Sequence, residues 1–380
     1  MQKNIAIIGG GIVGSTAAYY LSRQGQKVTL FDESHGQATK AAAGIICPWF
    51  SLRRNKPWYL LVSNGAEFYQ KLMKDLNEDG IPTESIFERE GAIFIRKNAS
   101  RIQKDLIMAE DKLKTSPSIQ KVYPISAQEI SQRCPHIQTD YDGIFVQGGA
   151  RVDGLQLIEN LQKAAEQMGA KIIREKAKIS HHSFDNIQIQ SVSYQDTFSH
   201  VLLSAGAWLP SILEPLGYKV DLNPQKGQLF TIKNSEWANK HWPVIIPFGQ
   251  GDIIPFNNGQ ITIGATHEDE QGFDLTVDLN PLSQLKAEAQ HWMPSLSDYT
   301  IESIRVGTRA QTSAYSVIVG PVPNLHNIWT ISGLGSSGLT SGPYLGYQWS
   351  QLIMQGQWNI LQSEFPIENY IKKTEHISRN

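Results

Sequence analysis

The fold is decided by IAIIGGGIVG, residues 5–14, in which an unbroken apolar run meets three glycines and then the start of a helical pattern. A buried parallel strand typically shows such a continuous run. Gly9 allows the tight turn out of the strand, Gly11 allows a pyrophosphate to approach the backbone, and Gly14 allows the helix to pack on the sheet. The helix N-terminus favours an anion, so the stretch predicts a dinucleotide-binding turn.

The next segments complete the unit that such a turn requires. Apolar residues recur at helical spacing up to Leu21, and Gly25 is a plausible residue to end the helix. A second apolar strand, residues 28–31, ends at Asp32, 18 residues after Gly14. An acid there can accept hydrogen bonds from the ribose hydroxyls of an adenosine. A glycine-rich turn without a ligand is the alternative, and the strand, helix and acid together disfavour it.

Composition limits the classes of protein that fit. A chain of 380 residues exceeds what one core usually serves, so two domains are expected. The 34 Lys and Arg against 36 Asp and Glu leave a net charge of −2, which offers no basic field for nucleic acid. The two cysteines, Cys47 and Cys134, favour a reduced cytoplasmic protein and form no metal-binding pattern. No apolar run is long enough to predict a membrane span.

Two later segments repeat the pattern of the nucleotide-binding unit. Residues 152–169 place apolar side chains on one helical face, with Asp153 as N-cap. Residues 201–204 form an apolar strand that runs into small residues around Gly206. Because ligands lie at the strand ends of open parallel sheets, Gly206 is a candidate cofactor contact.

The remaining segments favour a different kind of structure. Residues 56–77 predict a helix, and several short alternating strands follow Asp221. Asn257-Asn258-Gly259 predicts a hairpin turn between residues 252–255 and 260–263. The expected fold class is therefore α/β, a Rossmann-like domain with a parallel sheet, interleaved with an α+β domain on an antiparallel sheet. The expected boundaries are 1–50, 142–217 and 301–380 for the nucleotide domain, and 51–141 and 218–300 for a substrate domain.

A second glycine-rich block, GLGSSG at residues 333–338, follows an apolar strand at 328–331. Only 42 residues remain beyond Gly338, and none forms a strand ending in an acid at the required distance. We therefore interpret the block as a helix N-terminus that completes the first site. A glycine-rich connection without a ligand is the alternative.

Six blocks, taken together, resemble a known family. They read IGGGIVG, AAAG, SAGAW, IGAT, VGTR and GLGSSG, at residues 8–14, 41–44, 204–208, 263–266, 306–309 and 333–338. In this order the chain resembles the FAD-dependent D-amino-acid oxidase family, most closely its glycine oxidase, sarcosine oxidase and D-amino-acid dehydrogenase branch. The resemblance extends from Ile5 to Ile353.

The resemblance implies non-covalently bound FAD. Asp32 and Glu33 would meet the adenosine ribose, Ile12 and Val13 the pyrophosphate, and Ile179 would lie near the adenine. The loop beside the flavin would comprise Ala38, Thr39, Ala43, Gly44 and Ile45. The turn under the pyrimidine end of the flavin would comprise Leu334, Gly335, Ser336, Ser337, Gly338, Leu339 and Thr340. A helix N-terminus there would stabilise the negative charge of reduced flavin.

The resemblance also implies the chemistry. In the related oxidases the amine α-hydrogen passes as hydride to flavin N5, and water hydrolyses the resulting imine to an oxo acid. The flavin performs this chemistry, so no catalytic side chain is nominated. The expected partners are a small amino acid and oxygen or another electron acceptor. Arg309 matches the family arginine that pairs with the substrate carboxylate, and a guanidinium suits that role. A structural ion pair of Arg309 with Glu302 or Asp252 is the alternative.

The chain departs from the family pattern at the substrate end. Asp252 stands where glycine oxidases have a substrate-facing tyrosine, and Ser336 stands where some have a second arginine. These changes remove positive charge and add an acid, which suits a substrate with an extra cationic or secondary amine. Asp252 as a cap of the hairpin is an equal alternative.

Two other functions are compatible with the sequence. The GLGSSG block is similar to the oxidoreductase half of a bifunctional enzyme that removes an N-carboxymethyl group from tRNA wobble uridine, although the methyltransferase half is absent. A non-catalytic flavoprotein is the other possibility, and no sequence feature supports it.

Overall fold

The apolar strand at the start of the chain lies inside a six-stranded sheet, here the first sheet, of order β20-β21-β13-β1-β2-β9. The computed structural model describes residues 2–51, 53, 55–183, 186–325, 327–360 and 362–374. The strands pair in parallel, except that β20 is antiparallel to β21. The strands are β1 (Asn4–Ile8), β2 (Lys27–Phe31), β9 (Lys171–Ile173), β13 (His200–Leu203), β20 (Ile318–Pro321) and β21 (Ile328–Ser332).

Alternate side chains of β1 enter two different cores. Ile5 and Ile7 pack against the helices on one face of the first sheet. Ala6 and Ile8 pack on the other face, against a small antiparallel sheet and α6 (Leu209–Leu213). Both faces are covered, which explains why the strand is apolar throughout. The helices are α1 (Ile12–Arg23), α5 (Gly154–Gln167) and α8 (Gly338–Gln355), and the small sheet comprises β10 (Lys178–His182), β11 (Ile187–Gln190) and β12 (Gln195–Phe198).

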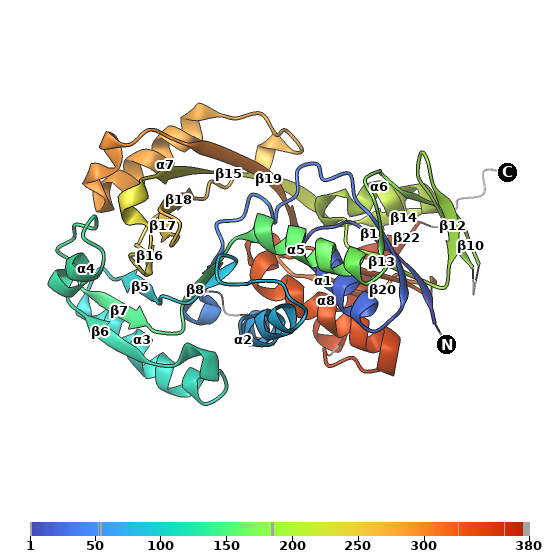
Figure 1. The fold of residues 1–380 in the computed structure, drawn as a ribbon, viewed down its shortest axis with the longest axis horizontal. Coiled ribbons are helices and arrows are strands. Elements are labelled where there is room, and N and C mark those ends of the chain that lie inside the picture. Colours follow the sequence, from blue (N-terminus) through green and yellow to red (C-terminus); the bar gives the residue numbers. More distant parts are fainter. Residues whose placement is uncertain are drawn as a thin grey trace.

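An eight-stranded second sheet has the order β19-β15-β18-β17-β16-β5-β7-β6 and is antiparallel except between β16 and β5. It occupies the left part of Figure 1, and the first sheet lies to its right. Its strands are β5 (Ala92–Ile95), β6 (Val122–Ile125), β7 (Gly143–Val146), β15 (Asn223–Lys233), β16 (Val244–Ile246), β17 (Asp252–Pro255), β18 (Gln260–Gly264) and β19 (Ser303–Gln311).

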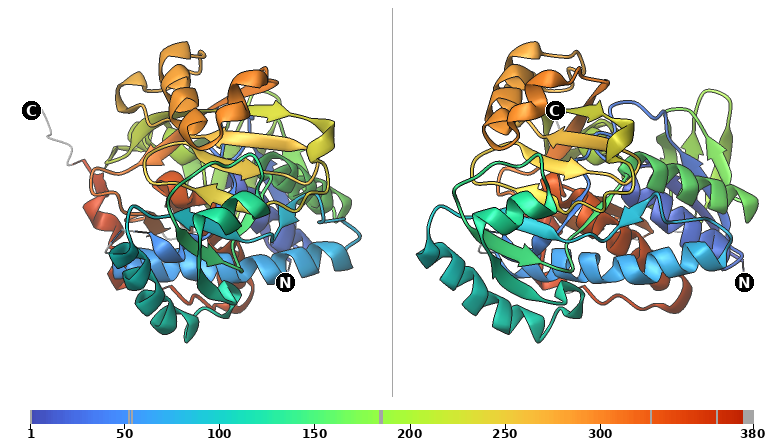
Figure 2. Two further views of the ribbon diagram at one scale, coloured as in Figure 1. Left: turned by 90° about the vertical axis from the view of Figure 1, so that its left-hand side faces the viewer. Right: turned by 60° about the vertical axis from the view of Figure 1, so that its left-hand side comes forward.

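Helices enclose the second sheet. One face packs against α4 (Ala127–Arg133) and α7 (Leu279–Trp292). α3 (Ala99–Leu113) contacts β6 and β7. The long α2 (Lys56–Glu78) packs on α8 and runs across the lower half of the molecule in both views of Figure 2. Two small sheets complete the fold: β3 (Ile45–Ile46), β8 (Ala150–Val152) and β4 (Phe87–Glu88) form one, and β14 (Tyr218–Val220) with β22 (Ile371–Lys373) forms the other.

The expected fold class is confirmed, because a parallel sheet with helices and a largely antiparallel sheet are both present. One local expectation differs: β15 is a single strand of 11 residues rather than a short one, because β18 and β19 pair with it on either side. The domain boundaries stay a prediction. β7 and β19 belong to the second sheet, although they lie within ranges assigned to the nucleotide domain.

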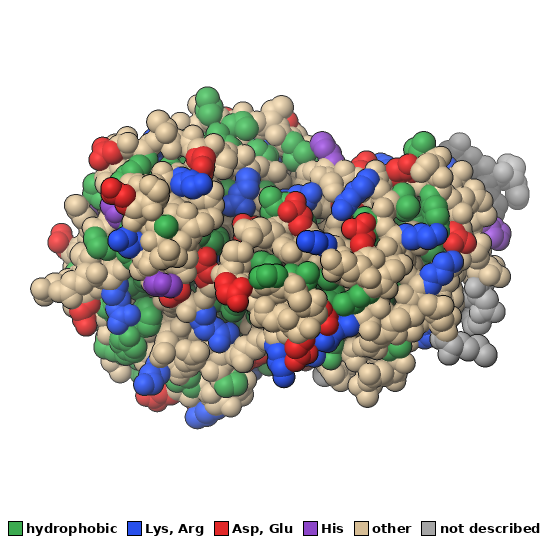
Figure 3. Space-filling model, viewed as in Figure 1, with side chains coloured by type: hydrophobic (Ala, Val, Ile, Leu, Met, Phe, Trp, Pro, Cys, Tyr) green, Lys and Arg blue, Asp and Glu red, His purple; other side chains and the backbone are tan. Residues whose placement is uncertain are grey.

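Two general features follow from the described part of the chain. None of its helices has the length and apolar character needed to cross a membrane. Lys and Arg side chains are interspersed with Asp and Glu over the face drawn in Figure 3, as the nearly balanced charge suggests.

Candidate functional site

The glycine turn after β1 is closed by backbone contacts that exclude a side chain. Gly9 has φ of +107°, and a Cβ there would lie 2.4 Å from the Ser204 carbonyl oxygen. A Cβ on Gly14 would lie 2.0 Å from the Gly9 carbonyl oxygen. α1 therefore packs directly on the ends of β1 and β13.

Gly11 differs from its neighbours because it faces open space. A Cβ on Gly11 would meet only the Thr39 hydroxyl, at 3.5 Å. Gly11 is also the N-cap of α1, so no N-cap side chain shields the first N–H groups of the helix. The Ile12 N–H donates to Thr39 Oγ1 at 3.2 Å, which holds the loop after β2 against this helix end. The arrangement leaves the start of α1 open, and the anion site at this position stays a prediction.

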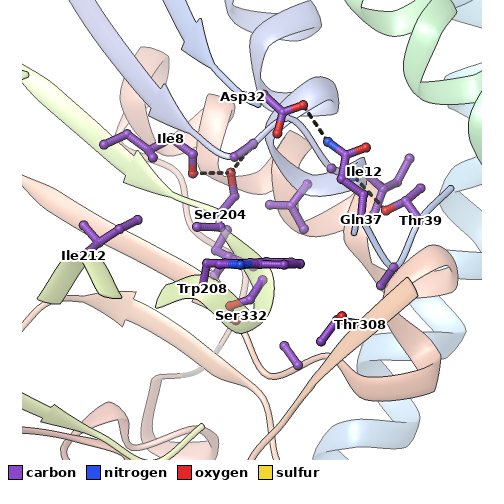
Figure 4. A pocket seen from close by; sticks show the side chains of 18 of the residues that line it. Ile8, Ile12, Asp32, Gln37, Thr39, Ser204, Trp208, Ile212, Thr308 and Ser332 are labelled. Carbon is purple, nitrogen blue, oxygen red and sulfur yellow. Dashed lines mark hydrogen bonds between the residues drawn. The ribbon is translucent and has the colours of Figure 1, made fainter. Parts of the chain in front are cut away.

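Asp32 lies directly after β2, beside this turn. Its Oδ2 accepts hydrogen bonds from Gln37 Nε2 at 2.6 Å and Ser34 Oγ at 3.0 Å. Figure 4 shows Asp32, Gln37, Thr39 and the end of α1 around one pocket, which we name the Asp32 pocket. The pocket lies at the carboxyl ends of the strands of the first sheet. Its lining includes Gly9, Gly11, Ile12, Val13, Asp32, Glu33, Ala38, Thr39, Ser204, Gly206, Trp208, Thr308, Ser332, Leu334, Gly335 and Gly338.

Two buried polar atoms in the lining residues of the Asp32 pocket lack a partner in the structure. They are Gln37 Oε1 and Thr308 Oγ1. Gln37 and Thr308 also face each other across an isolated parallel bridge between the loop and β19. An unpaired buried polar group costs about 1 to 3 kcal/mol. A polar ligand in the pocket would remove that cost, so the residues present fit a bound nucleotide.

A second cavity, which we name the Arg309 cavity, adjoins the first. Ala38, Thr39, Gly335 and Gly338 line both. The other walls are the loop from Ala41 to Cys47, one face of the second sheet, and the start of α8 at Gly338. One elongated ligand could therefore extend from the Asp32 pocket into the Arg309 cavity along the four shared residues.

The register of the second sheet places opposite charges on the face that forms the cavity. Arg309 lies opposite Gln225 of β15, and Gly307 lies opposite Gly227. Gly264 of β18 lies opposite both Leu229 and Asp252. Paired residues on neighbouring strands project to the same face of a sheet, and so do every second residues along one strand. Gln225 and Leu229 therefore share a face, and Arg309 and Asp252 project from that same face.

Glycines keep this face low enough to hold a ligand. A Cβ on Gly227 would lie 2.6 Å from two guanidinium nitrogens of Arg309, so the Arg309 side chain extends across Gly227. A Cβ on Gly307 would lie 2.7 Å from Ala41 Cβ, because the loop that follows β2 crosses there. Side chains at these two positions would fill the floor of the cavity and displace its walls.

Only one of the three nitrogen atoms of the Arg309 guanidinium donates a hydrogen bond to a described residue. Its Nη1 donates to the Thr266 carbonyl oxygen at 3.0 Å and to Gln225 Oε1 at 3.2 Å. No carboxylate of a described residue forms an ion pair with it, so the alternative of a structural ion pair with Glu302 or Asp252 finds no support. Burial lowers the pKa of Arg309, and Glu268 and Asp269 act against that change. Arginine still stays charged, and Nε and Nη2 are free to hold a carboxylate.

Asp252 has no hydrogen-bond or ion-pair partner among the described residues. The hairpin turn is closed without it, since Gln260 N–H donates to Asn258 Oδ1 at 3.0 Å at the opposite end of β17. Burial raises the pKa of Asp252 to about 7. The carboxyl lines the cavity and takes no part in the hydrogen bonds that close the hairpin.

Three further side chains line the Arg309 cavity. Ser336 is exposed and lines this cavity, and its predicted role on the substrate side stays a prediction. His267 lies near Arg309, and burial together with that charge lowers its pKa. Cys47 is a buried free thiol whose pKa is raised by burial.

Most of the predicted cofactor residues line one of the two spaces. One group lines the Asp32 pocket and is named with it above. The other group lines the Arg309 cavity, together with the residues that both spaces share, and comprises Ala43, Gly44, Ile45, Ser336, Leu339 and Thr340. Three predicted residues line neither space. Gly14 packs under the turn, Ile179 lies in the core with Ala177 at the pocket instead, and Ser337 Oγ accepts from Trp58 Nε1 at 3.1 Å.

Sequence reasoning did not single out Gln37, Thr308, Trp208, Gly227 or His267 as site residues. Thr308 and Trp208 lie inside blocks that carry the family resemblance, and His267 directly follows one. Gln37 and Gly227 had no comparable signal, because their roles depend on a loop and a strand that meet only in the fold.

Residues 4–352 match the family model described as FAD dependent oxidoreductase (DAO). The chain belongs to this family. The cofactor of the family is FAD, as the sequence predicts. Among the described residues, no group of three His, Cys, Asp or Glu could hold a metal ion.

Individual relatives cover nearly the whole chain. An uncharacterised oxidoreductase of Bacillus subtilis (strain 168), YurR, is 36% identical over 358 residues, 94% of this chain and 96% of that protein. The glycine oxidase of Pseudomonas putida is 26% identical, over 90% of this chain and 92% of that protein. The crystal structure of iminodiacetate oxidase from Chelativorans sp. BNC1 has a TM-score of 0.90 and 31% identity, over 95% of this chain and 98% of that one.

Proposed function

We propose that this protein oxidises the C–N bond of a small amino acid, namely glycine, a D-amino acid or an N-alkyl glycine, with FAD as electron acceptor. The product is an imine, which water hydrolyses to an oxo acid. The observation that carries the proposal is one cavity that contains a half-buried guanidinium and an unpaired carboxyl on the same sheet face, beside a nucleotide pocket. These two charges complement the carboxylate and the amine of an amino acid.

The chain's own residues divide the work of holding FAD. Asp32 would bind the adenosine ribose, and Gly11 with the start of α1 would face the pyrophosphate. Gln37 and Thr308 carry the unpaired polar atoms that a bound nucleotide can satisfy. The flavin, which supplies a two-electron acceptor, would lie between the loop at residues 38–45 and the turn at residues 335–340.

Arg309 would orient the substrate. Its side chain is held by Thr266 and Gln225, so its free donors point in a fixed direction. A carboxylate paired with them is placed with little loss of side-chain entropy on binding. The neighbouring glycines let the substrate lie flat on the sheet, and the walls of the cavity limit access of bulk water.

The relatives support this class of substrate. The names of two of them, glycine oxidase and iminodiacetate oxidase, describe enzymes whose substrates combine an amine with at least one carboxylate. Iminodiacetate carries a secondary amine, which agrees with the expectation drawn from Asp252. N-substituted glycines therefore belong at the front of the set to be tested.

The test is anaerobic reduction of the purified, yellow protein. Glycine, sarcosine, iminodiacetate, proline and a series of D-amino acids are added separately, and loss of the visible flavin band is recorded. We expect at least one to bleach the flavin. Methylamine and ethylamine, which lack the carboxylate, are the matched controls and should leave it oxidised. Peroxide formation after admission of air separates an oxidase from a dehydrogenase. A colourless protein that does not take up FAD, or a flavin that no amino acid bleaches, would refute the proposal.

A further inference from the structure

Asp252 is placed where it can act on the substrate nitrogen. The carboxyl stands on the cavity face of β17, opposite Gly264 of β18, which has no side chain to cover it. The Arg309 guanidinium lies over Gly227. From the usual spacing of strands and of residues along a strand, the Cα atoms of Gly227 and Asp252 are roughly 12 Å apart in the sheet. A small zwitterion held by Arg309 would therefore extend toward Asp252.

The surroundings of Asp252 leave its carboxyl without competing partners. β16 and β18, the strands on either side, carry no titratable side chain in the residues that pair with β17. The titratable groups that share the cavity are Arg309, His267 and Cys47. Behind the loop that leads into β17, Glu288 of α7 accepts a hydrogen bond from the Gln250 N–H at 3.0 Å and is engaged there.

A small amino acid reaches the enzyme mainly as an ammonium ion, whose nitrogen has no lone pair. Loss of hydride from the adjacent carbon requires that lone pair, since it forms the C=N bond of the imine. A proton must therefore leave the nitrogen first, and a general base works best when its own affinity for protons matches the ambient pH. Burial raises the pKa of Asp252 to about 7, which meets that condition.

We propose that Asp252 is a catalytic residue that pairs with the substrate ammonium and accepts its proton. The N–H bond breaks, the proton moves to a carboxylate oxygen of Asp252, and the electron pair stays on nitrogen. The protonated carboxyl later returns the proton to water through the cavity. This inference rests on the proposed function, and it deepens that function by assigning the deprotonation step to a residue.

The first experiment is the pH dependence of flavin reduction under anaerobic single-turnover conditions. The quantity measured is the second-order rate constant for reduction of the flavin at low substrate concentration. For the natural sequence we expect a rise of about 30-fold from about pH 5.5 to about pH 8.5, because only the ionised carboxyl accepts a proton. D252N should lose this inflection and fall by about 100-fold at the upper end. H267Q is the matched control, since it changes the other titratable side chain near Arg309 and should keep the inflection.

The second experiment counts protons without any turnover. 2-Aminoisobutyrate has no α-hydrogen, so it can bind but cannot be oxidised. Calorimetric titration in two buffers of different ionisation enthalpy at about pH 7 should show release of roughly half a proton for the natural sequence, because Asp252 must ionise to pair with the ammonium. D252N should release none. The FAD content and melting temperature of D252N should match those of the natural sequence.

The outcomes separate the two proposals. If amino acids reduce the natural protein and D252N shows the same inflection and the same proton release, Asp252 is not the proton acceptor, and the proposed function stands. If no amino acid reduces the natural protein at any pH, the proposed function fails and this inference fails with it. A lost inflection together with lost proton release supports both.

Discussion

The two halves of the site are built in different ways. At the Asp32 pocket the decisive feature is backbone packing, because an added Cβ on Gly9, which lines the pocket, or on Gly14, which packs under the turn, would come within 2.0 to 2.4 Å of main-chain oxygen. In the Arg309 cavity the decisive feature is a pair of ionisable side chains, Asp252 and Arg309, on strands separated by two others. A backbone turn depends on residues that are neighbours in the sequence, so a local motif can predict it. A pair of charges on distant strands depends on the sheet register, and no local motif predicts it. The following predictions test that contrast, from the largest expected effect to the smallest.

The largest effect is expected at the glycine turn. G14A places a Cβ 2.0 Å from the Gly9 carbonyl oxygen and 2.6 Å from Ser204 Oγ, both fixed by the sheet. We expect a loss of at least about 3 kcal/mol in the free energy of unfolding and a protein that does not retain FAD. Urea denaturation and flavin absorbance measure the two effects.

G25A is the matched control for that substitution. Gly25 has φ of +73° and no atom within 4 Å of an added Cβ, so only the backbone penalty of about 1 kcal/mol remains. Equal destabilisation by the two substitutions would show that close packing at Gly14 does not govern the pocket.

A large effect on catalysis alone is expected in the Arg309 cavity. R309M removes the guanidinium that would pair with the substrate carboxylate, so kcat/KM should fall by about 100- to 1000-fold while the FAD content stays unchanged. R305M is the control, because Arg305 lies on the same strand and bonds the Lys40 carbonyl oxygen and Thr262 Oγ1 outside the cavity. It should lower stability and leave KM unaltered. Loss of FAD from R309M would contradict the division into two halves.

An intermediate effect is expected at Asp32. D32N keeps the shape of the side chain but weakens its bonds to Gln37 and to a ribose hydroxyl, so FAD should dissociate about ten times more readily. Fluorescence titration of the apoprotein with FAD measures this. D140N, at an exposed carboxylate without a partner in the structure, should bind FAD as tightly as the natural sequence. An unchanged affinity of D32N would remove Asp32 from the nucleotide site.

The smallest effect is expected at Thr308. Its hydroxyl is buried without a partner, so T308V should leave the stability of the apoprotein unchanged or slightly higher. The affinity for FAD should nevertheless drop by about fivefold, or about 1 kcal/mol, because a bond to the ligand is lost. T231V is the contrasting control. Thr231 Oγ1 forms a hydrogen bond with Thr262 Oγ1 at 3.1 Å within the protein, so this substitution should destabilise the apoprotein instead.

The sequence could predict the first half of the site because its determinants are local. The strand, the glycines and Asp32 lie within 28 residues, and each occupies the place that its chemistry requires. Asp153 caps α5 as expected, accepting from the Gln156 N–H at 3.0 Å, and Gly259 turns the hairpin with φ of +86°. These are short-range effects of backbone geometry.

The second half could not be derived in the same way. Nothing near Gly227 indicates that the guanidinium of a residue 82 positions later lies over it, because that contact depends on the register between β15 and β19. Ile179 shows the same limitation, since its approximate position came from the resemblance and Ala177 lines the pocket instead. Pairing between distant strands is a property of the whole fold.

The parallel sheet joins segments that lie far apart in the sequence, and this affects synthesis. Only β13 separates β1 (Asn4–Ile8) from β21 (Ile328–Ser332) in the sheet. The turn that follows β21 contributes residues to both the Asp32 pocket and the Arg309 cavity. A ribosome must therefore translate the segment that contains β21 and the turn after it before the site can form. We expect the nascent chain to take up its coenzyme only after that segment has emerged and paired.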